Sequence, residues 1–233
     1  MSKKVSDLRD KLQDVYKMHG GLETTCARQC GCCRVACPMM SYSEAMVIMV
    51  RVWSEWDKAE ILELLLTCVD HFFSRSLVKP CPLLDGDGCS VYEDRPLMCR
   101  LYGLWPKEAY DRRVEVKAAE LGLPKEQIPL NVQCMFVKRV VNEPLTEEQI
   151  QSMEAAIDAI DKMVLVKAEK MSETDASVRI RKDWNYRRIE DWILFKVFGE
   201  EFLSIMTQKL LSSSDEEIRL LKEEFKAAAK EAF

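Results

Sequence analysis

Cysteine is the residue type whose number and spacing carry the clearest chemical signal in this sequence. Nine of the ten cysteines lie between Cys26 and Cys99, and the tenth is Cys134. Thiolate sulfur is a soft ligand that zinc and iron–sulfur clusters prefer, and four thiolates can surround one tetrahedral ion. We therefore expect a metal, zinc or iron, held by these candidate ligands: Cys26, Cys30, Cys32, Cys33, Cys37, Cys81, Cys89, Cys99 and Cys134.

The first block of cysteines is dense enough for one loop to wrap an ion. Four of them fall within the eight residues from Cys26 to Cys33. The run Cys30-x2-Cys33-x3-Cys37-Pro38 resembles the end of the bacterial ferredoxin motif, but Cys26 lies one residue too early to complete it. An iron–sulfur cluster therefore stays an alternative to zinc or mononuclear iron. With only two histidines in the chain, all-thiolate ligation is expected in place of a Cys2His2 site.

The second block of cysteines carries a family resemblance. It begins with Cys81-Pro-Leu and continues as Gly88-Cys89-Ser-Val-Tyr92-Glu93-x-Arg95-Pro96-x-x-Cys99-Arg100. With the first block, this pattern resembles the YkgJ-like CxxCxxCC cysteine-cluster family, a zinc- or iron-chelating domain, over residues 22–136. The first block departs from the family pattern because Cys30 stands one place late. The resemblance implies metal binding, with Cys134 as a late ligand, and implies no general reaction.

Some residues near the cysteine blocks have a structural interpretation instead. Cys68 stands among apolar residues in a predicted helix and is expected in the core. His71 is expected to be a core histidine with its hydrogen bonds satisfied. Arg95 and Arg100 flank Cys99 and would offset the negative charge of the thiolates. The alternative for these two arginines is a surface salt bridge to Glu93 or Asp94.

Composition and charge limit the class of protein. The chain has 233 residues, 48% of them hydrophobic, which is enough for a sizeable core. The net charge of −5 gives no basic excess for nucleic acid. No run approaches the roughly 18 apolar residues of a membrane span, and the N-terminus lacks the apolar core of a secretion signal. We therefore expect a cytoplasmic protein, in which thiols stay reduced, with no membrane and no nucleic acid as partner.

The elements that must position the cysteines are predicted to be mostly α-helical. Apolar residues at helical spacing predict helices over 5–18 and 150–163. Helices are also expected over 58–76, which is rich in Leu, Phe and Ile, over 184–198, which is rich in aromatic residues, and over 107–121, a polar stretch closed by Gly122. Capping boxes, in which a hydroxyl or carboxylate and a Glu or Gln three residues later satisfy helix-start amides, occur at Ser41, Asp57, Thr146 and Ser214. The fold expected is irregular cysteine-rich metal-binding loops within a helical domain, followed by a C-terminal helical part.

The domain prediction is a cysteine-cluster region over 22–136 and a helical C-terminal region over 146–233, with packing into one domain as the alternative. The C-terminal helices would offer a surface to a protein partner. The predicted function is a metal-binding protein with a structural or metal-handling role. The alternative is an iron–sulfur protein in electron transfer, or a redox enzyme or its subunit. No nucleophile, acid–base pair or glycine-rich cofactor loop stands out, so catalytic residues are unknown, no organic cofactor is expected and no enzyme is assigned.

Overall fold

Helices make up most of the structure, a computed structural model that describes residues 3–23, 33–34, 37–76, 79–86, 88–128, 144–171 and 186–231. These ranges hold nine α-helices, which confirms the mostly α fold. They are α1 Lys3–Tyr16, α3 Tyr42–Glu55, α4 Lys58–Phe72, α5 Leu97–Leu101, α6 Lys107–Leu121, α7 Glu147–Met171, α8 Ile189–Phe198, α9 Glu200–Ser212 and α10 Asp215–Glu231. Three 3-10 turns also occur: η1 Met18–Gly20, η2 Tyr92–Asp94 and η3 Lys125–Gln127.

The predicted capping boxes begin four of these helices. Ser41 Oγ accepts from the Glu44 amide at 3.3 Å, and Glu44 Oε2 accepts from the Ser41 amide at 3.0 Å. Asp57 and Glu60 form the same reciprocal pair at the start of α4. Thr146 with Gln149 and Ser214 with Glu217 do so before α7 and α10. Each box satisfies amide groups that a helix start leaves without an intrahelical acceptor.

Two short antiparallel strand pairs interrupt the helices. Strand β1, Met39–Ser41, pairs with β4, Tyr186–Arg188, and β2, Leu84–Asp85, pairs with β3, Gly88–Cys89. The helix predicted from Trp184 therefore starts later, at Ile189, because Tyr186 to Arg188 is held extended by pairing with Ser41 to Met39. The helix predicted to reach Ser76 ends at Phe72.

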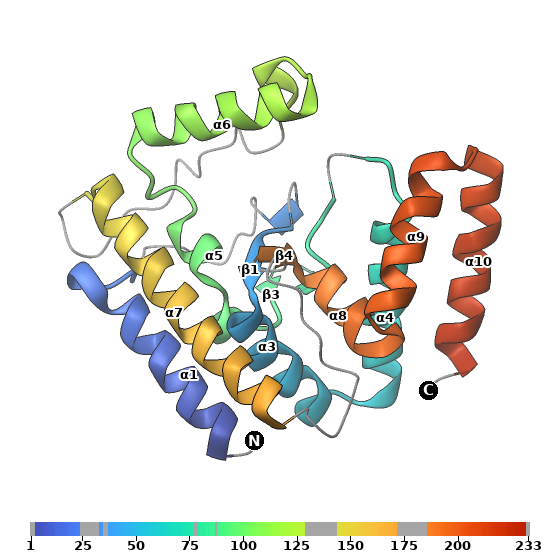
Figure 1. Ribbon diagram of the computed structural model, residues 1–233, viewed down its shortest axis with the longest axis horizontal. Coiled ribbons are helices and arrows are strands. Elements are labelled where there is room, and N and C mark those ends of the chain that lie inside the picture. Colours follow the sequence, from blue (N-terminus) through green and yellow to red (C-terminus); the bar gives the residue numbers. More distant parts are fainter. Residues whose placement is uncertain are drawn as a thin grey trace.

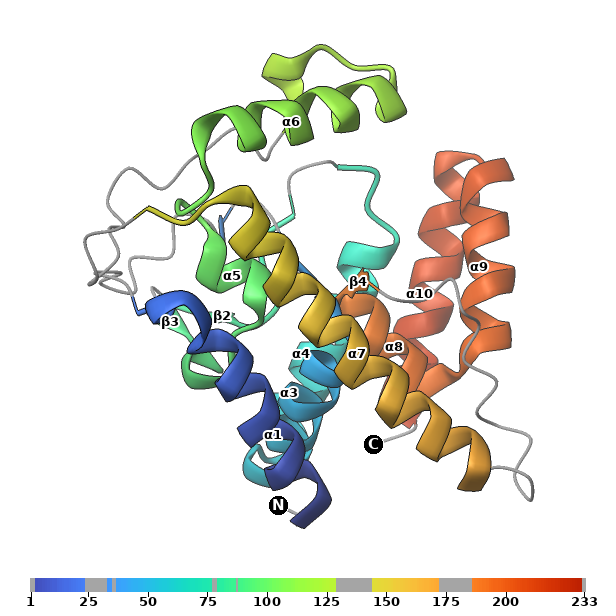
Figure 2. The same ribbon diagram turned by 60° about the vertical axis from the view of Figure 1, so that its left-hand side comes forward.

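Two hydrophobic cores share helix α3. The first core joins α3, α4, α8 and α10, with Val52, Leu65, Ile193 and Phe225 among its buried residues. The second core joins α1, α3, α5 and α7 and includes Leu12, Val47, Leu97, Ile150 and Ile157. Figures 1 and 2 both show α1 beside α7, and α8 beside α4. Residues from both ends of the chain thus stabilise the segments that carry the cysteines.

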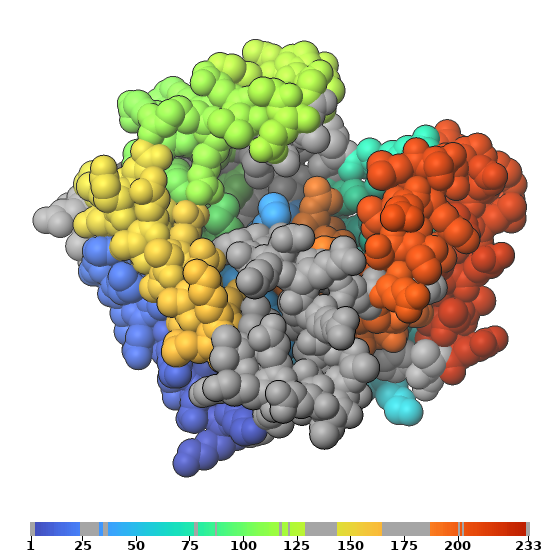
Figure 3. Space-filling model, viewed as in Figure 1, coloured from blue at the N-terminus to red at the C-terminus, as the bar shows by residue number. Residues whose placement is uncertain are grey.

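Three of the helices lie at edges of the molecule. Figure 3 shows α6 along one edge and α9 with α10 along another. Helix α6 ends at Gly122, whose φ of 63° is the left-handed conformation that glycine adopts without strain. Across the part of the chain that the structure describes, no helix combines the length and apolar character needed to cross a membrane.

Candidate metal centre

The second cysteine block reaches the first through the segment that follows α4. Lys79 Nζ donates to the carbonyl of His71 at 2.6 Å, which fixes the chain where it turns back from the helix. Pro80 is exposed, but Cys81 belongs to the first core, and its amide donates to the Cys33 carbonyl at 2.6 Å. One backbone hydrogen bond therefore joins two cysteines that are far apart in the sequence.

Cys37 and Cys81 form a buried pair of thiols. Each is only 8% exposed, and both are free cysteines. A hydrogen bond with Cys81 is the largest cause that raises the pKa of the Cys37 thiol, followed by burial and by the nearby Glu190 carboxylate. Without a cation, the neighbouring Cys81 thiol and Glu190 carboxylate favour the protonated form of Cys37. A bound metal ion would favour the thiolate instead.

The β2–β3 hairpin positions Cys89 on the same side of the molecule. Leu84 lies opposite Cys89 in the antiparallel register, and the Ser90 amide donates to the Leu83 carbonyl at 3.0 Å. Cys33 and Cys89 are half-buried and pack against the first core, to which Cys37 and Cys81 belong. Four predicted ligands, two from each cysteine block, are therefore attached to one core.

Cys99 is carried by the second core instead. It is half-buried on α5, whose Leu97 and Leu101 are buried in that core. Cys99 lies close enough to Tyr16 and Arg100 to affect the pKa of both groups. Burial lowers the pKa of Arg100, while Tyr16 and Cys99 act against that effect.

Arg100 is held beside Cys99 by backbone acceptors and an aromatic ring. Its Nε donates to the Arg95 carbonyl at 2.8 Å and its Nη2 to the Glu93 carbonyl at 2.7 Å. The guanidinium carbon lies 4.3 Å from the centre of the Tyr16 ring. Asp94, one alternative partner considered from the sequence, pairs with other arginines: with Arg9 at 2.6 Å and with Arg51 at 3.0 Å. The two hydrogen bonds of Arg100 therefore go to backbone carbonyls, and a charge-offsetting role beside Cys99 stays a prediction.

A carboxylate that the sequence analysis did not single out lies against the thiol pair. Glu190, in the first turn of α8, is only 1% exposed. Neither of its carboxylate oxygens meets a hydrogen-bond partner by conventional geometry within the described ranges, and Arg188 Nη1 lies 3.6 Å from Oε1. Burial raises the pKa of the next residue, Asp191, to about 6, and the Glu190 charge adds to this rise while Arg187 and Arg188 oppose it. No sequence motif marks Glu190, because only the β1–β4 pairing brings it near Cys37.

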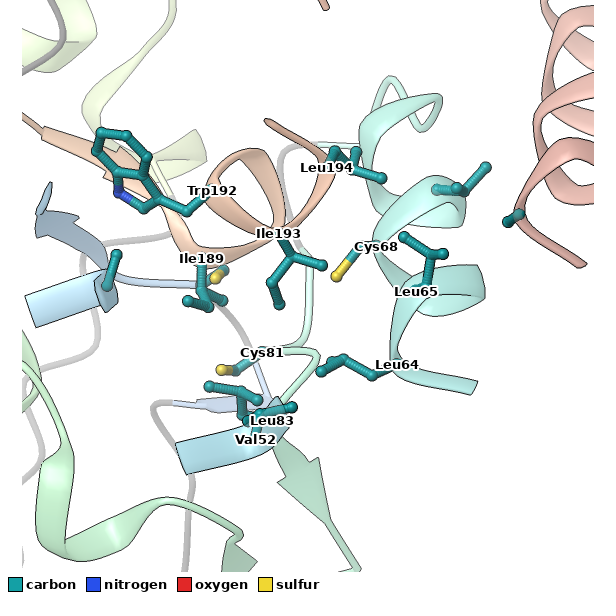
Figure 4. Packing of buried hydrophobic residues seen from close by; sticks show 14 of the residues in the cluster. Val52, Leu64, Leu65, Cys68, Cys81, Leu83, Ile189, Trp192, Ile193 and Leu194 are labelled. Carbon is teal, nitrogen blue, oxygen red and sulfur yellow. The ribbon is translucent and has the colours of Figure 1, made fainter. Parts of the chain in front are cut away.

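Cys68 is a core residue, as predicted. It is fully buried on α4, and burial raises the pKa of its thiol well above the usual range. Figure 4 shows its sulfur directed from α4 toward Ile193 of α8, with Cys81 below Ile189. A thiol in such apolar surroundings is inert compared with one that a cation activates.

His71 lies on the wall of an open pocket and not in the core. The pocket has a volume of about 560 Å³ and is lined by Cys81 and by the acidic residues Glu60, Glu63 and Asp85, among others. His71 is half-buried, and its Nδ1 has no hydrogen-bond partner among residues the structure describes. The prediction that its hydrogen bonds are satisfied in the core is therefore wrong. Burial lowers the pKa of this histidine, which favours the neutral ring.

The arrangement does not close around an ion by itself. Within the described part of the chain, no three His, Cys, Asp or Glu side chains form a group that could hold a metal ion as they stand. Of the nine predicted ligands, Cys33, Cys37, Cys81, Cys89 and Cys99 are described, and the other four lie outside the described residues: Cys26, Cys30, Cys32 and Cys134.

Comparison with known proteins confirms the resemblance carried by the cysteine blocks. No curated protein and no solved structure matches this chain. A protein-family model does match one segment of the chain. This segment includes both cysteine blocks and ends within α6, before α7 begins. Its description supports a metal-binding role. Residues 25–119 of the chain match the family CxxCxxCC, described as a "Putative zinc- or iron-chelating domain".

Proposed function

We propose that this protein binds zinc or mononuclear iron through thiolates of its two cysteine blocks, with a structural or metal-handling role. The ligand set proposed is Cys26, Cys30, Cys32, Cys33, Cys37, Cys81, Cys89, Cys99 and Cys134. We also place it in the cytoplasm, where a reducing environment keeps these thiols available for metal. Its C-terminal helices would present a surface for a protein partner.

The contact between Cys37 and Cys81 is the observation that carries this proposal. One thiol comes from each cysteine block, both are buried in the first core, and the nearby Cys81 is the largest cause that raises the pKa of the Cys37 thiol. A pair of sulfur atoms brought together from distant parts of a chain is the start of a thiolate site. The ions that such sites prefer are the ones named in the family description.

The chemistry of the surrounding residues fits a cation. The carboxylate of Glu190 is buried beside the Cys37 thiol and pairs with Arg188, whose Nη1 lies 3.6 Å from Oε1. An ionised group in that position is costly to bury unless it is paired or bound to a metal. A cation bound by the thiolates of Cys37 and Cys81 would add positive charge beside this carboxylate. Once bound, its binding free energy would contribute to folding, because both cysteine blocks would be tied to one point.

Elemental analysis tests the proposal. Protein purified anaerobically, with iron, zinc and acid-labile sulfide measured on one sample, should hold zinc or iron with no labile sulfide. Protein that contains sulfide together with iron, and shows a broad absorption band near 400 nm, would favour the alternative iron–sulfur protein. Protein that takes up neither metal after reconstitution under reducing conditions would contradict both functions.

A further inference from the structure

An open groove runs along one face of helix α4. It is the pocket of about 560 Å³ described above, and successive turns of the helix line it with Glu60, Leu64, Thr67 and His71. From the first to the last of these residues the helix rises about 16 Å. The opposite wall is the segment 80–85. The groove is therefore long enough for about five residues of an extended chain.

The charged side chains that line this groove are all acidic among the residues that the structure describes. Glu60 and Glu63 come from α4, and Asp85 comes from the opposite wall. Within the described ranges, the carboxylates of Glu63 and Asp85 are exposed and form no ion pair with a lysine or arginine. Burial lowers the pKa of His71, so its neutral ring adds no positive charge. The groove therefore carries negative charge that no described lining residue offsets.

Trp56 adds an aromatic surface to the groove at the corner where α3 meets α4. Its ring is half-buried, and its amide donates to the Val52 carbonyl at 3.0 Å. The capping box of Asp57 and Glu60 follows directly, so backbone hydrogen bonds hold this corner in place. An aromatic ring together with carboxylates is the combination of groups that binds a guanidinium or an ammonium group.

The opposite wall of the groove is rigid. Pro80 and Pro82 fix two of its φ angles, and the Leu84 amide donates to the Cys81 carbonyl at 3.0 Å. A preformed wall lowers the entropy that binding costs. Sites for small molecules normally enclose most of the ligand surface, whereas this groove is open to solvent. Its shape therefore suits a segment of polypeptide better than a small molecule.

We propose that this groove binds a basic, extended segment of a partner protein, with an arginine or lysine side chain held by Trp56, Glu63 and Asp85. The positive charge of such a segment complements the carboxylates on both walls, and its backbone lies along α4. The inference does not depend on the proposed metal site. It adds a second interaction surface to the one proposed for the C-terminal helices.

The experiment titrates the isotope-labelled full-length protein with the peptide Gly-Arg-Ala-Arg-Gly and follows its amide chemical shifts by NMR, which detects even weak binding. A second peptide has neutral citrulline in place of both arginines. The arginine peptide should shift the amide signals of α4 and of residues 80–85, and the citrulline peptide should leave them unchanged. Glu63→Gln combined with Asp85→Asn should weaken binding of the arginine peptide by about fivefold or more.

Asp7→Asn combined with Asp10→Asn is the matched control. It removes the same charge from exposed positions of α1, and none of the described residues that line the groove belongs to α1. This variant should bind the arginine peptide within about twofold of the unmodified protein. Equal losses of affinity in the two double variants would show attraction by net charge alone and would overturn the inference.

The remaining outcomes concern the occupant. No shifts with the arginine peptide, shifts outside the groove, or equal shifts with the citrulline peptide would each overturn the inference. Free arginine amide that binds as tightly as the peptide would identify a site for small cations, which overturns the proposal of a polypeptide segment. If the Glu63 and Asp85 double variant does not fold, Glu63→Gln alone, compared with Asp7→Asn alone, decides by the same criterion.

Discussion

Glu44 Oε1 accepts a hydrogen bond of 2.6 Å from the backbone amide of Leu97. The same oxygen accepts from the Tyr16 hydroxyl at 2.8 Å, and Oε2 accepts from the Ser41 amide at 3.0 Å. One buried carboxylate thus ties α1 and the start of α3 to α5, the helix that carries Cys99. Burial raises the pKa of Glu44, although the three donors act in the opposite direction.

Glu44→Ala is expected to destabilise the protein by about 3 kcal/mol or more, since it leaves three buried donors without an acceptor. Glu44→Gln keeps an acceptor oxygen and removes the cost of burying a charge, so it should cost only about 1 kcal/mol. Urea denaturation of both variants, compared at one pH, measures the difference. Equal losses for the two variants would contradict the assignment of Glu44 as a shared acceptor.

Local signals in the sequence predicted the helices and their starts well. The Ser41–Glu44 capping box is formed by residues three apart, so its geometry depends only on local backbone structure. The helix over 107–121 ends before Gly122 as expected, because its left-handed φ suits glycine. In both cases the residues that fix the end of the helix lie within one or two helical turns of it.

Contacts between distant segments could not be predicted in the same way. Nothing near Tyr186 to Arg188 marks a strand, because the pairing that extends it comes from Met39 to Ser41. Glu190 reads as an ordinary helix-start glutamate until that pairing sets it beside Cys37. The cysteine spacing indicates candidate ligands and not which of them share an ion, because which of them meet depends on the packing of α3, α4 and α8.

Cys81→Ser should lower the amount of bound metal, because Cys81 contacts Cys37 and also lines the open pocket. A serine hydroxyl is a poor replacement for a thiolate ligand at neutral pH. Metal per chain, measured by elemental analysis after identical anaerobic purification, checks this result. Unchanged metal content would remove Cys81 from the proposed ligand set.

Cys68→Ser is the matched control for that substitution. Cys68 is fully buried in the same core, and its burial raises the pKa of the thiol. We expect the metal content to stay unchanged, while stability falls by about 1–3 kcal/mol because a hydroxyl is buried among apolar side chains. Loss of metal in Cys68→Ser with a normal circular dichroism spectrum would show that its assignment to the core alone is wrong.

The division into regions 22–136 and 146–233 remains a prediction, and a truncated chain tests it. Removing residues 146–233 would take Ile189, Trp192 and Ile193 from the first core, and Ile150 with Ile157 from the second. It would also remove the hydrogen bond from Trp192 Nε1 to the Met40 carbonyl, 3.3 Å long. We expect the remaining chain to lose its near-UV circular dichroism signal and its cooperative unfolding. A cooperatively folded fragment of residues 1–145 would favour two independent domains.

The contact between α4 and α10 should depend on both pH and salt through Asp70. Its Oδ1 lies 2.5 Å from Lys222 Nζ and 2.8 Å from Lys226 Nζ. Partial burial alone would raise the pKa of Asp70, but the two lysines outweigh it and lower the pKa.

Because the pKa of Asp70 is lower in the folded state, the stabilisation from this ion pair is fully present above the unfolded-state pKa of about 3.9. It is lost as the pH falls through the folded-state pKa. Asp70→Asn should therefore cost about 0.5–1 kcal/mol at pH 7, less in 1 M salt, and progressively less as the pH falls toward 3. Denaturation at these conditions measures it, with Asp215→Asn as control because the Arg75–Asp215 pair is mostly exposed. An Asp70→Asn cost that stays the same from pH 7 to pH 3 would show that the lysines contribute by packing and not by charge.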